Sequence, residues 1–348
     1  MQTNPRASGE LNLIQDSAST EFWEAIDHIT QDVCWQSALH TQYTIPYFQM
    51  QSEEAGIHTQ DRSFVAMWED TPHIAFIGSM IERDGVRDLF AHKVPCTLIE
   101  DKRQARDKPT KAVIRMFDEL VSDINGTVQM RDFLIDGTIS SLSEHMLRHG
   151  ASATPAYSQV INLSQEESRL KSRLRKSYRS LINWGLRELN PRVLTTDDIS
   201  WEDVLAFRDL HTRVAGRETR TEATWRRQFE AVKRDQGFVV MGYQGEELVT
   251  AGLFSHNTCN CYYSSSASRR DLFDKPLFHA LMWTAILHAR NRGLRWLEMG
   301  DQVLLAANDA SEIDPKEVSI MDFKAGFGSD KRVSLDLAWN PMDHEHGK

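Results

Sequence analysis

Residues 321–330 read "MDFKAGFGSD", between a strand-like stretch "RWLEMGD" (295–301) and another, "RVSLDLAW" (332–339). Lys324 follows a phenylalanine and precedes an Ala-Gly-Phe-Gly run. Glycine allows close backbone approach and positive φ, so the segment suits a turn or loop between two strands. Lysine is almost never buried unless it is paired, so spacing alone favours a solvated lysine over one placed beside a reacting group.

Three helices are predicted upstream of this segment, after a strand "SQVINL" (158–163). Ser164 stands three residues before Glu167, the spacing of a capping box, and predicts one helix that continues through Tyr178 and Leu181. Ser200 is placed as the N-cap of a second helix, which runs to about Val214. The third helix covers residues 222–237 and ends at a glycine.

The strands follow those helices. Two apolar runs, 238–244 and 248–257, flank a glycine-containing turn and predict a hairpin, and residues 260–268 form the next strand. Asp274 is predicted to cap a helix that has Pro276 in its first turn. The resulting order, β-α-α-α-β-β-β-α-β-loop-β, predicts a mixed α/β sheet.

The first half of the chain gives weaker signals. It predicts a helix with a Ser/Thr start over 19–29, two strands joined by a turn at 69–72, a helix over 108–124, a strand over 127–135 and a short helix over 141–150. A chain of 348 residues exceeds the usual size of one hydrophobic core, so two lobes are expected, with the boundary near 151–157.

Composition limits the possible functions. The chain is 41% hydrophobic and 26% charged with a formal net charge of −10, which is typical of a globular protein and argues against DNA as a default partner. The four cysteines are scattered and only Cys259 and Cys261 are close, so no metal site is expected. No signal peptide is evident, and the longest apolar run (277–289) is too short to cross a bilayer. We therefore expect a cytoplasmic protein.

The second half resembles the GNAT acyltransferase superfamily and, more closely, the FemAB-like (Fem-type) transferases of bacterial cell-envelope and polysaccharide biosynthesis. The resemblance rests on "LRKSYRSLINWG" (174–185), "HTRVAGRETR" (211–220), "YYSSSASRRDLFDKPLFHALMWTAI" (262–286), "RGLRWLEMGD" (292–301) and "FKAGFG" (323–328). It implies an α/β (α+β) fold of two tandem GNAT-like lobes, each a mixed central sheet flanked by helices. The expected ranges are a loose segment 1–18, a diverged lobe 19–155, an acyltransferase lobe 156–340 and a tail 341–348.

The resemblance also implies amide formation, in which an acyl or aminoacyl group passes to an amine on an anionic cell-envelope or glycan precursor. The donor is aminoacyl-tRNA in Fem-type enzymes and acyl-CoA in other GNAT members, and no tightly bound cofactor is expected. The family's Phe-Lys-x-x-Phe-Gly motif falls on Phe323, Lys324, Phe327 and Gly328. Lys324 would stabilise the tetrahedral oxyanion, and Phe323 would contact substrate. Two alternatives stay open: an acyl-CoA-dependent N-acetyltransferase acting on a sugar nucleotide, and a catalytically silent GNAT-like scaffold.

Basic segments supply candidate contacts for an anionic substrate. Six bases lie within residues 169–179, either as the outer face of an amphipathic helix or as a grip for phosphate or carboxylate. The preferred substrate contacts there are Arg175, Lys176 and Tyr178. A second basic segment, residues 211–220, adds the candidate substrate contacts His211, Arg217 and Arg220. His211 is either a base or a packing residue.

The stretch 262–276 lies where GNAT enzymes hold the CoA pyrophosphate, but it has serines where those enzymes have glycines. The candidate phosphate contacts are Ser264, Ser265, Ser266, Arg269 and Arg270. Tyr263 is a candidate acid for the leaving group, or else a core residue. Glu298 and Asp301 end a strand where a carboxylate would serve as the base for the acceptor amine, or would only cap or pair.

Overall fold

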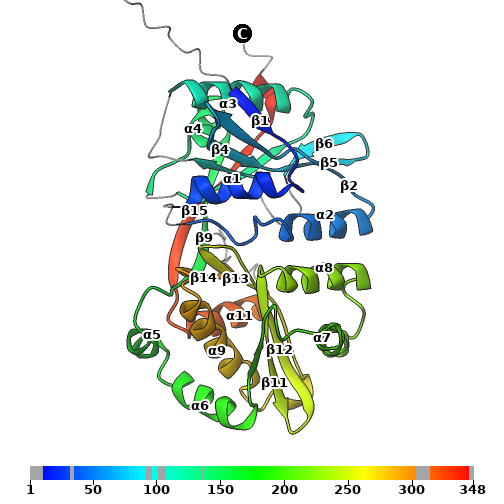
Figure 1. Ribbon diagram of the computed structural model, residues 1–348, viewed down its shortest axis with the longest axis vertical. Helices are drawn as coiled ribbons and strands as arrows, with labels where there is room; N and C mark the ends of the chain where they lie inside the picture. The colour runs from blue at the N-terminus through cyan, green and yellow to red at the C-terminus, as the bar shows by residue number, and fades with distance from the viewer. Residues whose placement is uncertain are drawn as a thin grey trace, which may run out of the picture. The chain divides into compact units, whose positions relative to one another are not determined.

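The computed structural model describes residues 11–31, 35–90, 96–100, 107–134, 137–302 and 314–344 (Figure 1). The chain forms two compact units. One consists of Met1–Cys34, Ser52–Thr154 and Leu335–Lys348, and the other of Trp35–Gln51 and Pro155–Ser334.

The two units are not the contiguous ranges expected from the sequence. The segment Trp35–Gln51 belongs to the second unit because Trp35 packs on Trp296, with ring centroids 5.9 Å apart, and lies under the Arg332 guanidinium at 4.1 Å. The C-terminal segment belongs to the first unit because Leu335–Trp339 pairs with residues 128–132. Long-range pairing of this kind leaves no local mark in the sequence.

The first unit combines helices with two groups of strands. One group is an antiparallel sheet in the order β1-β3-β4-β7, and the other follows the order β15-β8-β6-β5-β2. Ser19 caps α1 by accepting from the backbone N–H of Phe22, which confirms the predicted Ser/Thr start. The predicted turn between the first two strands is also confirmed, as it joins β3 to β4. The elements are β1 (Leu11–Ile14), α1 (Thr20–Thr30), α2 (Thr44–Glu54, shared with the second unit), β2 (His58–Asp61), β3 (Phe64–Trp68), β4 (Thr71–Ile77), β5 (Ser79–Arg83), β6 (Val86–Leu89), β7 (Thr97–Glu100), α3 (Asp107–Val121), β8 (Val128–Asp132) and α4 (Ser141–Arg148).

The second unit is built on a mixed sheet in the order β10-β11-β12-β13-β14-β9-β15. The predicted hairpin is confirmed as β11 and β12, and β13 and β14 run parallel. Alternate residues of β11 enter different cores, as expected for a sheet covered on both faces. Phe238 packs with α6 (Tyr178–Glu188) and α9 (Leu277–Asn291), whereas Val239 packs with α7 (Trp201–Ala215) and α8 (Glu222–Lys233). The strands are β9 (Ser152–Asn162), β10 (Arg192–Leu194), β11 (Gly237–Gln244), β12 (Glu247–His256), β13 (Asn260–Ser268), β14 (Trp296–Asp301) and β15 (Asp330–Trp339).

The helices of this unit correct four expectations. The helix predicted from Ser164 is two helices separated at 174–177, and its N-cap residue is Glu166, without a side-chain cap. The helix predicted to start at Asp274 instead has Pro276 at the N-cap. The segment before Gly326, expected to be a loop, is helix α11. The predicted N-cap Ser200 is confirmed on α7. The helices are α5 (Glu167–Arg173), α6 (Tyr178–Glu188), α7 (Trp201–Ala215), α8 (Glu222–Lys233), α9 (Leu277–Asn291) and α11 (Pro315–Ala325), with short 3₁₀ turns η3 (Arg270–Leu272) and, in the C-terminal segment, η5 (Pro341–His344).

Both units combine helices with β-sheets, which agrees with the α/β (α+β) class expected from the sequence. Across the described ranges, no helix has the combination of length and apolar composition needed to cross a bilayer.

Candidate active site

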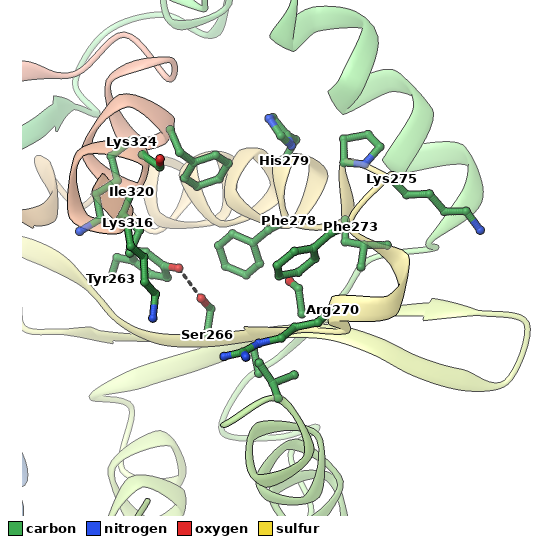
Figure 2. Close-up of a pocket in the computed structure, with 17 residues that line it drawn as sticks. Tyr263, Ser266, Arg270, Phe273, Lys275, Phe278, His279, Lys316, Ile320 and Lys324 are labelled. Carbon is green, nitrogen blue, oxygen red and sulfur yellow. Dashed lines mark hydrogen bonds between the residues drawn. The ribbon is translucent and has the colours of Figure 1, made fainter. Parts of the chain in front are cut away.

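A cavity of about 810 Å³ opens in the second unit beside β13 (Figure 2). The parallel pairing of β13 with β14 extends only from Asn260↔Trp296 to Tyr262↔Glu298. Beyond this pairing, Tyr263 and residues 266–268 of β13 line the cavity, together with the start of α9 and one side of α11. Its volume is in the range of small-molecule sites. The lining residues are Val214, Tyr263, Ser266, Ala267, Ser268, Arg270, Phe273, Lys275, Pro276, Leu277, Phe278, His279, Lys316, Ser319, Ile320, Phe323 and Lys324.

A β-bulge sets the polar groups of the strand wall. Neighbouring residues of β12 pair with Tyr263 and Ser265, which leaves Ser264 as an extra residue on β13. A bulge changes the alternation of side chains, so Tyr263 and Ser266 face the same side although they are three residues apart. Their hydroxyls are hydrogen-bonded to each other (Figure 2). Burial raises the pKa of Tyr263 to about 12, against the opposing effect of that hydrogen bond.

Ser264 and Ser265 do not line the cavity, in contrast to the expected row of phosphate contacts. The hydroxyl of Ser264 is 2.8 Å from that of Ser255 on the neighbouring strand. The two arginines also separate. Arg270 lines the cavity, whereas Arg269 is ion-paired with Glu247 and Asp271 outside it.

Lys324 lies in the last turn of α11, not in a glycine loop. Its Nζ is 5.7 Å from the centroid of the Tyr263 ring, over the ring face, and a Cβ placed on Gly300 would lie 3.1 Å from it. Within the part of the chain that the structure describes, Nζ makes no hydrogen bond or salt bridge. Burial lowers the pKa of this lysine, and the charge of Asp301 partly opposes the shift. The result is a half-buried ammonium at one end of the cavity.

The cavity has a strong charge asymmetry. Four cationic side chains line it, and no Asp or Glu is among its lining residues, although the whole chain carries a net charge of −10. Figure 2 shows Lys316 and Lys324 near Tyr263 at one end, with Lys275 extending from the other. Phe278 and Phe323 supply apolar wall. His279 adds no charge, because burial lowers its pKa to about 4.

The two candidate carboxylates differ in exposure. Glu298 is 2% exposed and accepts a hydrogen bond of 3.4 Å from Ser37 Oγ. Asp301 is exposed at the end of β14, where it accepts a hydrogen bond of 3.2 Å from Ser158 Oγ. Neither residue lines the cavity, but Asp301 acts electrostatically on Lys324. It is therefore the better placed of the two to exchange protons with solvent.

Two of the three substrate contacts predicted in the segment 169–179, Arg175 and Tyr178, bind helix α11 instead. The Arg175 guanidinium binds the Asp322 carboxylate, and the Tyr178 hydroxyl donates to the backbone carbonyl of Phe323 at 3.0 Å. Tyr178 is buried, while Lys176 is exposed. None of Arg175, Lys176 and Tyr178 lines the cavity, whereas Phe323 does.

His211 and Arg220 form a separate cluster. The Nη1 of Arg220 lies 3.4 Å from His211 Nε2, and its Nε donates to the Tyr47 hydroxyl at 2.8 Å. Burial first, and then the charge of Arg220, lower the pKa of His211 to about 4, so this histidine is neutral at physiological pH. Arg217 is exposed, and none of these three candidates lines the cavity.

The sequence interpretation missed several wall residues, above all Lys316 and Ile320 of α11 and Phe278 of α9. A start signal for α11 was present: Asp314 accepts from the backbone N–H of Lys316, and Pro315 occupies the first turn. The described residues hold no group of three or more His, Cys, Asp or Glu side chains arranged for a metal ion.

No protein-family model matches the sequence, and no curated protein matches it. Solved structures do share its fold. FemX superposes with a TM-score of 0.69 at 10% identity, over 92% of this chain and 97% of that one. L-PGS from Bacillus licheniformis superposes with a TM-score of 0.57 at 11% identity, over 94% of each chain. A tandem GNAT protein from the clavulanic acid biosynthesis pathway superposes with a TM-score of 0.51 at 13% identity, over 94% of this chain and 98% of that one. The chain therefore has the two-lobed GNAT/FemX-like fold that its sequence resembles.

Proposed function

We propose that this chain, which has the two-lobed fold of FemX, is an acyl or aminoacyl transferase that forms an amide bond in the cavity beside β13. One observation carries the proposal: a cavity with four cations and no carboxylate ends at the half-buried amine of Lys324. An acidic protein gains nothing in fold stability from grouping cations in this way, so the arrangement fits an anionic ligand.

The donor that suits this cavity carries phosphate next to an apolar or aromatic portion. Arg270, Lys275 and Lys316 would bind phosphate oxygens, and Phe278 and Phe323 would pack on the uncharged part. Aminoacyl-tRNA and acyl-CoA both have this chemistry. Ser264 and Ser265 lie outside the cavity, so the serine hydroxyls of β13 contribute less to phosphate binding than the arginine and lysines.

The proposed reaction is direct transfer. The acceptor amine attacks the acyl carbonyl, a C–N bond forms, and the C–O or C–S bond to the donor breaks. The Lys324 ammonium stabilises the oxyanion of the tetrahedral intermediate, because a fixed cation in a partly dry site is worth far more than in water. The proton lost by the amine passes through water to Asp301, which lies outside the cavity, and Tyr263 supplies a proton to the leaving oxygen or sulfur. Tyr263 is protonated at neutral pH, and because burial raises its pKa it is a weak acid that suits an alkoxide leaving group better than a thiolate.

The acceptor is proposed to be an amine on an anionic cell-envelope or glycan precursor. This part rests on the resemblance of residues 156–340 to Fem-type enzymes. Exposed bases outside the cavity, such as Lys176 and Arg217, are available to the acceptor rather than to the donor.

The test combines binding with transfer. Thermal unfolding is measured with acetyl-CoA, charged tRNA, uncharged tRNA and nucleotide sugars, and amide products are then followed by mass spectrometry with a panel of amine acceptors. A donor at 100 times its Kd should raise Tm by about 4 °C. Lys324→Ala should keep most of this shift and lose transfer, while Lys331→Ala, an exposed lysine outside the cavity, should keep both.

Two results would reject the proposal. Undiminished transfer by Lys324→Ala would remove the lysine from the mechanism. Binding of an anionic donor without amide formation from any acceptor would favour the silent scaffold.

A further inference from the structure

The last turn of α11, which carries Lys324, is held by the segment that separates α5 from α6. The backbone N–H of Arg175 donates to the Gly326 carbonyl at 2.8 Å. The Arg175 side chain binds both carboxylate oxygens of Asp322, at 2.9 and 2.6 Å, and also reaches the Asp322 carbonyl at 3.2 Å. Gly326 is the C-cap residue of α11, and carbonyls at a helix end lack intrahelical donors, whereas the Asp322 carbonyl also accepts from the backbone N–H of Gly326 at 3.2 Å. Arg175 thus ties down the helix terminus through both its backbone and its side chain.

Tyr178 holds the same turn from another direction. Its hydroxyl donates to the Phe323 carbonyl at 3.0 Å, and its ring packs on Phe327 at 5.1 Å between centroids. A Cβ on Gly326 would lie 2.3 Å from the Tyr178 ring, so only glycine admits the ring at this position. The contacts fall on residues 322, 323 and 326, which bracket Lys324.

The Lys324 side chain has no comparable fixing of its own. Among the described residues its Nζ makes no hydrogen bond or salt bridge, only a ring contact with Tyr263 on β13 and a longer-range attraction to Asp301 on β14. The position of Nζ therefore depends on where the α11 backbone places it.

The Arg175–Asp322 pair is exposed, with side-chain exposures of 40% and 64%. Exposed ion pairs contribute little to stability. A bidentate pair with added backbone bonds nonetheless fixes geometry, so its main effect here is on the position of the helix end.

We infer that Arg175, Asp322 and Tyr178 are positioning residues, which set the place of the Lys324 ammonium at the end of the cavity. The inference rests on the proposed function for its catalytic consequence, but not for its structural content. A shift of about 1 Å at a reacting centre can reduce a rate by 10²-fold. These three contacts would therefore affect the rate of transfer, although none of the three residues touches the cavity.

The test reads Lys324 directly and needs no substrate. Trace acetylation with acetic anhydride is followed at each pH from 7 to 11, and the peptide containing Lys324 is quantified by mass spectrometry against Lys331, an exposed internal reference. Only the neutral amine reacts, so the pH profile gives the pKa of Lys324. In the wild-type protein the pKa of Lys324 should lie below 10.5, because burial disfavours the charged amine.

Arg175→Lys, Asp322→Asn and Tyr178→Phe should move this titration up toward 10.5, because a loosened lysine reaches solvent. Each unit of increase reduces labelling at neutral pH about tenfold relative to wild type. The double variant Arg175→Ala/Asp322→Ala should shift no further than Arg175→Ala alone, since that variant already removes every side-chain contact between the two residues. The matched control is Arg173→Lys, which breaks a neighbouring bidentate pair with Asp330 at the start of β15 and leaves α11 untouched.

An unchanged Lys324 titration in all three positioning variants overturns the inference, whether or not the chain transfers acyl groups. A shift in Arg173→Lys as large as in Arg175→Lys also overturns it, because the effect would then be general loosening. If a donor supports transfer, the positioning variants should lower kcat roughly 10- to 100-fold with little change in KM. Shifted titrations without transfer from any donor would reject the proposed function and leave the positioning role standing.

Discussion

The Nζ of Lys324 lies against the backbone of Gly300, where an added Cβ would be only 3.1 Å away. Gly300 has φ +94° and sits in a bulge of β14, between the pairs that Glu298 and Asp301 make with β9. The glycine therefore provides both the backbone turn and the space that the ammonium occupies.

Gly300→Ala should displace Lys324 and also strain the backbone. We expect the free energy of unfolding to fall by roughly 1–3 kcal/mol because of the positive φ. We also expect a loss of transfer activity that this lower stability does not account for. Gly245→Ala is the matched control, because Gly245 has φ +64° with nothing within 4 Å of its added Cβ. Urea unfolding and the amide assay separate the two effects. Equal activity in both variants would show that the space beside Gly300 is irrelevant to the reaction.

Replacing Lys324 by an apolar residue should stabilise the protein while it stops transfer. The folded-state pKa of Lys324 is below the unfolded value of 10.5, so the unfolded state binds more protons between the two values and stability rises with pH there. Below that window the buried ammonium opposes folding. Lys324→Met should raise the free energy of unfolding at pH 7 by roughly 0.5–2 kcal/mol, measured by urea titration. Destabilisation instead would assign the lysine a structural role.

The pH dependence of transfer should report the same group. Transfer that needs the ammonium falls as pH rises through the lowered pKa of Lys324, below 10.5. Arginine stays charged over this range. Lys324→Arg should therefore extend activity to higher pH, even if its larger head lowers the rate at pH 7. A falling limb at the same pH in both proteins would point to another group.

Tyr263→Phe separates the two roles of Tyr263. The ring that faces Lys324 remains, while the hydroxyl and its hydrogen bond to Ser266 are lost. Removing a general acid typically costs 10²- to 10⁴-fold, so we expect a kcat loss of about that size. The loss should be smaller for donors with good leaving groups, such as aryl thioesters. Ser266→Ala, which retains the phenol, should lose much less activity. Equal losses for good and poor leaving groups would exclude Tyr263 as the acid.

The two adjacent arginines should behave differently. Arg270 lines the cavity, whereas Arg269 is already ion-paired with Glu247 and Asp271. A hydrogen bond to a charged group contributes about 1.5–3 kcal/mol, so Arg270→Gln should weaken donor binding roughly 10- to 100-fold. Arg269→Gln should change it little. Calorimetric titration at two salt concentrations checks this, and equal losses in both variants would contradict the assigned cavity.

Local signals in the sequence identified most elements of the second unit. Ser200 as an N-cap, the glycine turn of the β11–β12 hairpin and the strand "RWLEMGD" all depend on residues close to one another in the chain. Helix α11 was missed because its apolar residues give no amphipathic stripe. Ile320 is 43% exposed and lines the cavity, and Met321 is the only residue of α11 that the structure describes as a buried core residue.

The candidate site was predictable in part. The family motif identified Phe323 and Lys324, and both line the cavity with Tyr263, Ser266 and Arg270. Arg175 and Tyr178 also belong to the resemblance, yet they contact α11 instead of the cavity. Charge and spacing do not distinguish a base that meets a ligand from one that meets a carboxylate 147 residues later in the sequence.

By itself the sequence determined the α/β class, the hairpin over 238–257 and the lysine between two phenylalanines, since capping, alternation and glycine turns are local properties. Only the tertiary structure decided the surroundings of "FKAGFG". There Gly326 makes room for the Tyr178 ring, and Gly300 makes room for the Lys324 ammonium. The lysine that spacing alone would leave solvated in a turn is half-buried on a helix end, because burial depends on segments that the chain brings together from far apart.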